Sequence, residues 1–125
     1  MSKRIIILII ILSVVLSLAL LEETIIKNTF ESLEFRLNQM DVAIENDTIN
    51  EIDIDNLIGY WERRKRLLCM IVPHIEIRNI EIYLYQLKNA VENQEYFEAS
   101  EYIEVLLSQS RSIPKTFVLC LENIL

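Results

Sequence analysis

The chain opens with an apolar run and continues with stretches in which apolar residues recur at helical spacing. Residues 5–21 carry no charged side chain. As a helix this run would be about 25 Å long, slightly shorter than the roughly 30 Å of a bilayer's hydrocarbon core. Lys3 and Arg4 precede the run, and Glu22 and Glu23 follow it. We therefore expect a membrane-spanning helix whose basic, N-terminal side stays in the cytoplasm, with the rest of the chain outside.

The same segment has some features of a cleaved signal peptide. Ser17 and Ala19 form the small-x-small pattern that is typical of a cleavage site. Against cleavage, the run is longer than the roughly 7–15 apolar residues of most signal peptides, and Leu20 and Leu21 continue it. We favour a retained anchor over residues 1–21, and a cleaved signal stays open as the alternative.

Beyond the anchor, the first periodic stretch has apolar residues spaced alternately by four and three. That spacing places them on one face of a helix. The positions are Ile26, Phe30, Leu33, Leu37, Met40 and Ile44. Since no Gly or Pro lies between the apolar run and this stretch, we expect the anchor and the first helix to form one continuous rod.

Two further helices are predicted in the middle of the chain. Asp47 or Thr48 is a candidate cap for the second helix, and Pro73 is expected to end it. Its apolar face comprises Leu57, Trp61, Leu68 and Ile71. His74 is expected to open the third helix, which ends at a polar turn near residues 93–95. Its apolar face comprises Ile77, Ile80, Leu84, Leu87 and Val91.

A fourth helix completes the expected fold. Its buried face comprises Ala99, Ile103, Leu106, Ser110 and Ile113. Pro114 is expected to stop this helix, which leaves residues 116–125 as a short apolar tail. Because short connections make successive helices antiparallel, we predict an all-α fold: an N-terminal transmembrane helix continuous with an antiparallel four-helix bundle. The bundle, residues 22–125, is expected to be extracytoplasmic.

Charge and composition exclude several classes of function. The formal charge is −7, and since Lys3 and Arg4 are the only charged residues before Glu22, the remainder carries −9. Such an acidic body argues against general nucleic-acid binding, which depends on cations that contact phosphates. One His and two Cys without close spacing do not make a zinc site. We therefore predict no metal, no cofactor and no nucleic acid as partner.

No catalytic constellation is present either, so we expect the protein not to be an enzyme. His74, the one histidine, has no Ser or Cys motif beside it and is interpreted as a cap or turn residue. Cys69 and Cys120 would face an oxidising compartment, so a disulfide between them is one alternative. We favour two free, buried thiols.

Two short segments are candidate contact sites. The basic cluster Arg63, Arg64, Lys65 and Arg66 would lie about 10 Å above the bilayer if the second helix returns alongside the first, close to one Debye length. It would then contact lipid headgroups or a partner, although a solvated helix face explains the same cluster. The chain end Leu121, Glu122, Asn123, Ile124 and Leu125 either packs back onto the bundle or serves as a docking tail.

Several of these features together resemble a known family. The leading anchor, the segment from Trp61 to Lys65, His74 at the start of the third helix and the ending Leu-Glu-Asn-Ile-Leu are similar to domain of unknown function 4363. The chain departs from the family in two places. Ile75 and Ile77 stand where acidic residues are expected around this His, and the segment "INEIDID" before the second helix is irregular. The resemblance implies a small membrane-anchored protein of Gram-positive, often endospore-forming bacteria, and it implies no activity or site.

The anchor and the outward bundle lead to a functional hypothesis. We expect a single-pass accessory or scaffold protein of the cell membrane whose acidic bundle binds another membrane or envelope protein. The alternative is a bundle that senses a small or lipid-like ligand held between its helices. A continuous exposed apolar stripe would favour the first hypothesis, and a monomeric body with a cavity would favour the second.

Overall fold

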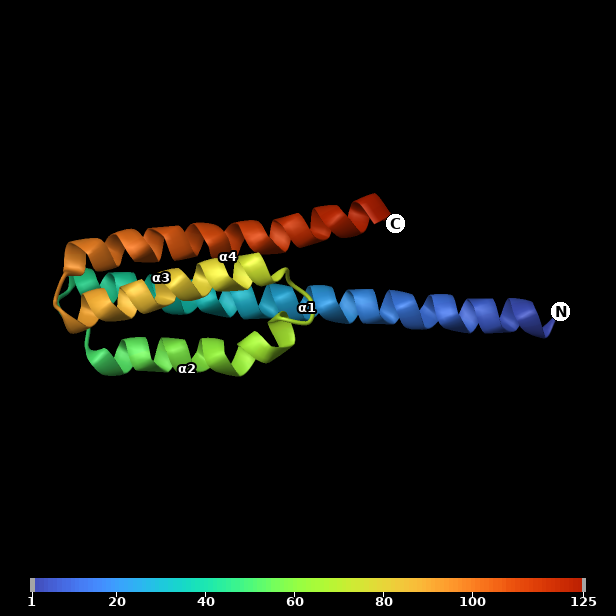
Figure 1. The fold of residues 1–125 in the computed structure, drawn as a ribbon, viewed down its shortest axis with the longest axis horizontal. Coiled ribbons are helices and arrows are strands. Elements are labelled where there is room, and N and C mark those ends of the chain that lie inside the picture. Colours follow the sequence, from blue (N-terminus) through green and yellow to red (C-terminus); the bar gives the residue numbers. More distant parts are fainter. Residues whose placement is uncertain (1, 125) are drawn as a thin grey trace.

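The computed structural model describes the backbone of residues 2–124 and the side chains of residues 2–117. Four helices make up the fold: α1 (Lys3–Glu45), α2 (Glu51–Leu68), α3 (His74–Glu92) and α4 (Tyr96–Ile124) (Figure 1). The predicted all-α class is confirmed, because the described part of the chain contains helices and turns without any strand.

α1 is one unbroken helix of 43 residues, about 65 Å long. Its N-terminal part projects from the bundle, and every described side chain up to Leu18 is exposed. By length and composition this part could cross a membrane, with a mean hydropathy of 3.0 over its most apolar window. A signal sequence near the N-terminus would have the same properties. The continuous rod expected from the sequence is confirmed.

The four helices pack as a bundle in which each neighbour along the chain is antiparallel (Figure 1). α1 and α3 lie diagonally opposite, and each of them contacts both α2 and α4. The faces predicted from the apolar spacing form the core: all positions named for α1, α3 and α4 are buried, as are Leu57, Trp61 and Leu68 of α2, whereas Ile71 is half-buried. Burial of these four stripes is what holds the bundle together.

The cap of α2 differs from the prediction. Asn50, rather than Asp47 or Thr48, precedes the helix and forms a capping box with Asp53. The Asn50 Oδ1 accepts from the Asp53 amide at 3.1 Å, and the Asp53 Oδ2 accepts from the Asn50 amide at 3.1 Å. Asp47 adopts a left-handed conformation, with φ of 53°, in the turn after α1. The capping box lets the irregular-looking segment that begins at Glu51 start a helix.

The end of α2 also lies earlier than predicted, at Leu68 instead of Pro73. Pro73 has no amide hydrogen to donate, and it disfavours helical geometry in the residue before it. The chain instead makes a turn over Cys69–Val72, whose amides bond to carbonyls of the last turn of α2. Pro73 then caps α3, which begins at His74 as expected.

Pro114 does not end α4, so this prediction was wrong. The helix runs from Tyr96 to Ile124 with Pro114 inside it, and the expected apolar tail is the continuation of this helix. A proline in a helix removes one hydrogen bond, here the one to the Ser110 carbonyl. Packing against α1 on both sides of Pro114, through Arg111 and through Phe117, supports the helix across that gap.

Candidate membrane-proximal site

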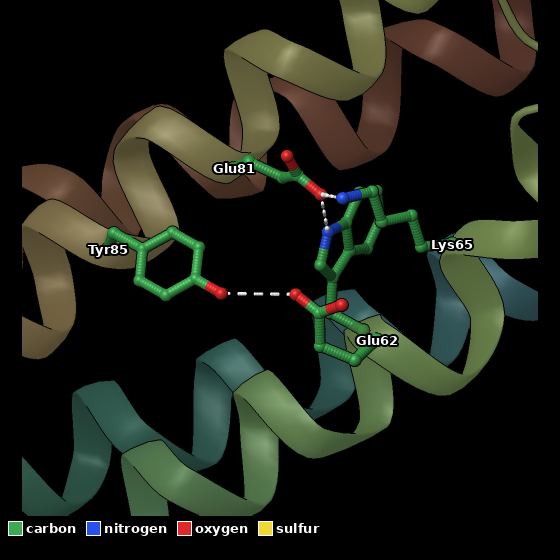
Figure 2. A network of polar contacts seen from close by, with 5 residues as sticks. Glu62, Lys65, Glu81 and Tyr85 are labelled. Carbon is green, nitrogen blue, oxygen red and sulfur yellow. Dashed lines mark hydrogen bonds and ion pairs between the residues drawn. The ribbon is translucent and has the colours of Figure 1, made fainter.

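The basic cluster predicted on α2 is divided between different neighbours. Lys65 forms an ion pair with the Glu81 carboxylate of α3 (Figure 2). The buried Trp61 donates to this carboxylate from Nε1 at 3.3 Å. Hydrogen bonding to Glu81 raises the pKa of Lys65 above its ordinary value. Lys65 therefore fastens α2 to α3.

A second contact joins the same two helices one turn away. The Tyr85 hydroxyl donates to the Glu62 carboxylate at 3.1 Å (Figure 2). This hydrogen bond raises the pKa of Tyr85, because the neighbouring negative charge opposes formation of the phenolate. Together with the Lys65 pair, it fixes the register between α2 and α3.

Arg64 instead lies over the ring of Tyr60, four residues earlier on α2. Its guanidinium lies 5.7 Å from the ring centre of Tyr60, and Arg36 of α1 lies 4.2 Å from the same ring. The Tyr60 hydroxyl donates to the Thr29 carbonyl of α1 at 3.3 Å. Of the cluster, only Arg63 and Arg66 are exposed without such a contact among the described residues, so these two are the cations available to a headgroup or a partner.

A groove runs between α1 and α4 on the side toward the apolar segment. It has a volume of about 680 Å³. Its lining comprises Glu23, Ile26, Lys27, Glu31 and Glu34 from α1, and Ser110, Arg111, Pro114, Lys115 and Phe117 from α4. Arg111 Nε donates to Glu34 Oε1 at 2.9 Å across it. The groove thus combines apolar side chains with charges of both signs.

The register between α1 and α4 places the end of α4 beside the apolar segment. Arg111 pairs with Glu34, and further from the apolar segment Ser100 Oγ donates to Asp41 at 3.0 Å. From Arg111 to Ile124, α4 continues for about 20 Å. An equal distance back along α1 from Glu34 ends near Leu21, where the apolar run stops. Both helices extend past the connection between α2 and α3 (Figure 1).

Comparison with known families identifies the family of this chain. The family model described as Domain of unknown function (DUF4363) matches residues 20–124. The chain belongs to this family. The DUF4363 match begins at the end of the apolar run and includes all of the bundle. No curated protein and no solved structure matches the chain.

Of the remaining candidate residues of this DUF4363 protein, the structure describes the side chains of His74 and Cys69. His74 is exposed at the first position of α3. Cys69 is a free, half-buried thiol, and the side chain of Cys120 lies outside the described residues. So do the side chains of Leu121–Leu125, of which the first four have their backbone in α4. Within the described part of the chain, no group of His, Cys, Asp and Glu could hold a metal ion.

Sequence reasoning missed the groove and the carboxylates that fix α2 to α3. Glu62 and Glu81 flank apolar seams, and each lies beside a cation or aromatic residue of the neighbouring helix only because of the register. The groove depends on α4 continuing through Pro114, which the sequence argued against. A signal was nevertheless present, since Phe117 falls at helical spacing from Ser110 and Ile113.

Proposed function

We propose that this protein is a single-pass membrane-anchored accessory protein whose bundle binds another membrane or envelope protein. The observation that carries the proposal is the groove between α1 and α4, because it lies next to the apolar segment. A protein that crosses the bilayer beside this anchor would emerge at the level of the groove. The proposed occupant is therefore the juxtamembrane helix of a membrane protein.

The chemistry of the groove suits a helix of mixed character. Ile26, Pro114 and Phe117 supply apolar surface, whereas Lys27 and Lys115 supply positive charge. Glu23 and Glu31 supply negative charge on the α1 side. An interface of this kind has an apolar centre and a polar rim, and a partner helix would present apolar residues at helical spacing with charges on either side.

The outer surface of the bundle gives further support. Phe35 and Val42 are exposed on α1, seven residues apart, and a shallow depression lies between them. Ile75 and Ile82 are exposed on α3 with the same spacing. Two short stripes of this kind are less than the continuous stripe that would favour the hypothesis most strongly, so the groove carries the argument.

The second candidate function is binding of a lipid-like ligand in the same groove. Its volume of about 680 Å³ falls within the roughly 300–1,000 Å³ of small-molecule sites. A ligand site usually encloses most of its ligand, however, whereas this groove lies between only two helices. A protein partner is thus the better-supported occupant.

Site-specific photocrosslinking separates these candidates. A photoreactive amino acid replaces Lys115 in the groove of the full-length protein, which is irradiated in its own membranes. We expect a crosslink to one membrane protein, identified by mass spectrometry, with the attached peptide next to a transmembrane segment of that protein. The intact mass of the purified chain, measured on the same sample, reports whether residues 1–19 are still present.

The matched control replaces Phe97, which is exposed on the same helix at the far end of the bundle. The same partner must not be attached from this position. A lipid adduct at position 115 without a protein adduct would support the ligand-binding candidate instead. Equal labelling from both positions would contradict a specific groove contact.

A further inference from the structure

The connection between α2 and α3 lies at the end of the bundle from which the apolar segment projects (Figure 1). Its height can be estimated from α1. Tyr60 of α2 is level with the stretch from Thr29 to Arg36, which it contacts, and Met70 is ten residues closer to the apolar segment. Counting 1.5 Å per helical residue, Met70 lies within about 10 Å of the level of Leu21, the last apolar residue of the run.

The exposed side chains at this end are unusually apolar. Leu67 is 44% exposed, Met70 82% and Ile75 62%. We call these three residues the α2–α3 tip. They do not belong to the core of the bundle, and within the described residues no other helix covers them. Large apolar side chains grouped on a surface mark a site of contact with a partner or a membrane.

Charge is distributed unevenly along the bundle and points to the same surface. The half of the bundle away from the apolar segment, residues 37–60 and 86–107, contains eleven acidic residues and a single cation, Lys88, for a formal charge of −10. The half beside the apolar segment, residues 22–36, 61–85 and 108–124, has a formal charge of +1. An acidic protein that lies against an anionic surface would turn its less negative half toward that surface.

The tip segment itself carries positive charge only. Residues 63–75 contain four cations and no acidic residue. Arg63 and Arg66, the two exposed cations of the cluster without a contact among the described residues, lie close to Leu67 on the same helix. Apolar side chains flanked by exposed cations are typical of elements that lie in the interface of a bilayer, because the apolar groups enter the acyl boundary while the cations contact headgroups.

We infer that the α2–α3 tip inserts into the bilayer interface as a second membrane contact, beside the span of α1. This inference rests on the membrane anchoring in the proposed function, but not on the protein partner. The headgroup layer extends roughly 5–7 Å beyond the hydrocarbon core on each side, which overlaps the estimated range of heights of the tip. A protein partner at the tip would require an additional molecule, whereas the bilayer is already present at that height. Two contacts would restrict rotation of the bundle about the axis of α1, which a single span leaves free.

Fluorescence quenching in vesicles tests the inference on the full-length chain. In a background of Cys69→Ser and Cys120→Ser, single cysteines are introduced by Met70→Cys, Ile52→Cys or Leu18→Cys and labelled with an environment-sensitive dye. The vesicles contain equal parts of phosphatidylcholine and phosphatidylglycerol, with nitroxide placed either on headgroups or high on the acyl chains. Ile75→Cys provides a second tip position, and circular dichroism checks that every variant is helical.

The three positions give distinct outcomes. We expect dye at position 70 to be strongly quenched by headgroup nitroxide, with a blue-shifted emission. Dye at position 52 should be unquenched, although Ile52 is an equally apolar residue, 67% exposed at the opposite end of α2. Dye at position 18 reports the span itself and should be quenched by acyl-chain nitroxide.

Quenching at position 18 without quenching at 70 and 75 would overturn the tip contact while leaving the anchor intact. Absence of quenching at all positions would overturn the membrane anchoring on which both proposals depend. Loss of the partner crosslink from position 115 with quenching at 70 retained would contradict the proposed function alone.

Discussion

At the scale of single residues, position within the helical period decides the role of a side chain more than its type. Phe30 and Phe35 lie on the same helix, yet Phe30 is fully buried and Phe35 is 62% exposed. Phe30 belongs to the seam spaced by fours and threes, whereas Phe35 lies on the opposite face of α1. The same substitution at these two positions should therefore change the free energy of unfolding by different amounts, since only Phe30 packs in the core.

Phe30→Ala is expected to lower the free energy of unfolding by about 3–5 kcal/mol, because it leaves a cavity in the centre of the bundle. Phe35→Ala, the matched control, is expected to change it by less than about 0.5 kcal/mol. Urea titration of the full-length protein in a mild detergent, followed by circular dichroism, measures both. Equal losses would contradict the assignment of the two faces.

The polar contacts between α2 and α3 predict an effect of alkaline pH. Hydrogen bonding raises the pKa of Lys65 above 10.5 and the pKa of Tyr85 above 10.0. In both groups the folded state favours the protonated form, so their stabilisation is complete below the pKa of the unfolded state and is lost as pH rises through the pKa of the folded state. We expect a modest decrease in stability above about pH 10, since both side chains are partly exposed.

Unfolding free energies measured at successive pH values check this expectation. The double variant Lys65→Met and Tyr85→Phe should lose less stability than the wild type between neutral and alkaline pH. Lys115→Met, which changes a lysine in the groove, serves as the control and should follow the wild type. Identical profiles for all three proteins would refute the contribution of these contacts.

These residues also show where sequence reasoning reaches its limit. Every core position named for α1 could be predicted from spacing, because one helix contains the whole pattern. The pairing of Lys65 with Glu81, sixteen residues later, could not, since it depends on the rotation and register of α2 against α3. The basic cluster could be predicted as a group, but the separate surroundings of its members could not: Lys65 pairs with α3, Arg64 lies over Tyr60 of its own helix, and Arg63 and Arg66 face solvent.

At the scale of elements, the number and order of helices could be predicted, whereas three of their ends could not: both ends of α2 and the end of α4. The start of α2 was misplaced because Asn50 and Asp53 cap each other, a pairing hidden among several candidate caps. The end of α4 was misplaced because Pro114 is a local signal, whereas the packing of α4 along α1 is a tertiary one. Tertiary contacts here outweigh the local preference of one residue.

Pro114→Ala is expected to stabilise the protein by about 1–3 kcal/mol, because alanine restores an amide donor and suits a helix interior. The thermal midpoint of the full-length protein should rise accordingly. Ser108→Ala, an exposed position on the same helix, is the control and should have a smaller effect. A decrease in the midpoint would show that Pro114 is required for the packing of α4 on α1.

At the scale of the whole molecule, the chain is polarised along its long axis. The apolar segment lies at one end and the strongly acidic half of the bundle at the other, with the groove and the α2–α3 tip between them. The alternation of sequence patterns predicted the separation of anchor from bundle. It could not predict that the charges segregate, because that requires knowing which helix ends lie together.

The orientation of the molecule in the membrane is a prediction from its flanking charges. With Lys3 and Arg4 on the cytoplasmic side, a phosphatase reporter fused after Leu125 should be active outside the cytoplasm, and a fluorescent reporter that folds only in the cytoplasm should be dark. Substitution of Lys3 and Arg4 by Glu is expected to shift part of the population to the opposite orientation. A fusion active only in the cytoplasm would contradict this topology.

Because α1 is unbroken, a change in the tilt of the apolar segment also tilts the bundle. Because no hinge separates the apolar segment from the bundle, a tilt of about 20° in the bilayer would move the far end of α1 sideways by about 12 Å. In the proposed anchoring, a hydrocarbon core thinner than the roughly 25 Å of the apolar run would make the run tilt, because a span longer than the local core is accommodated by tilting. A change of membrane thickness that is small in itself would thereby become a large displacement of the acidic end.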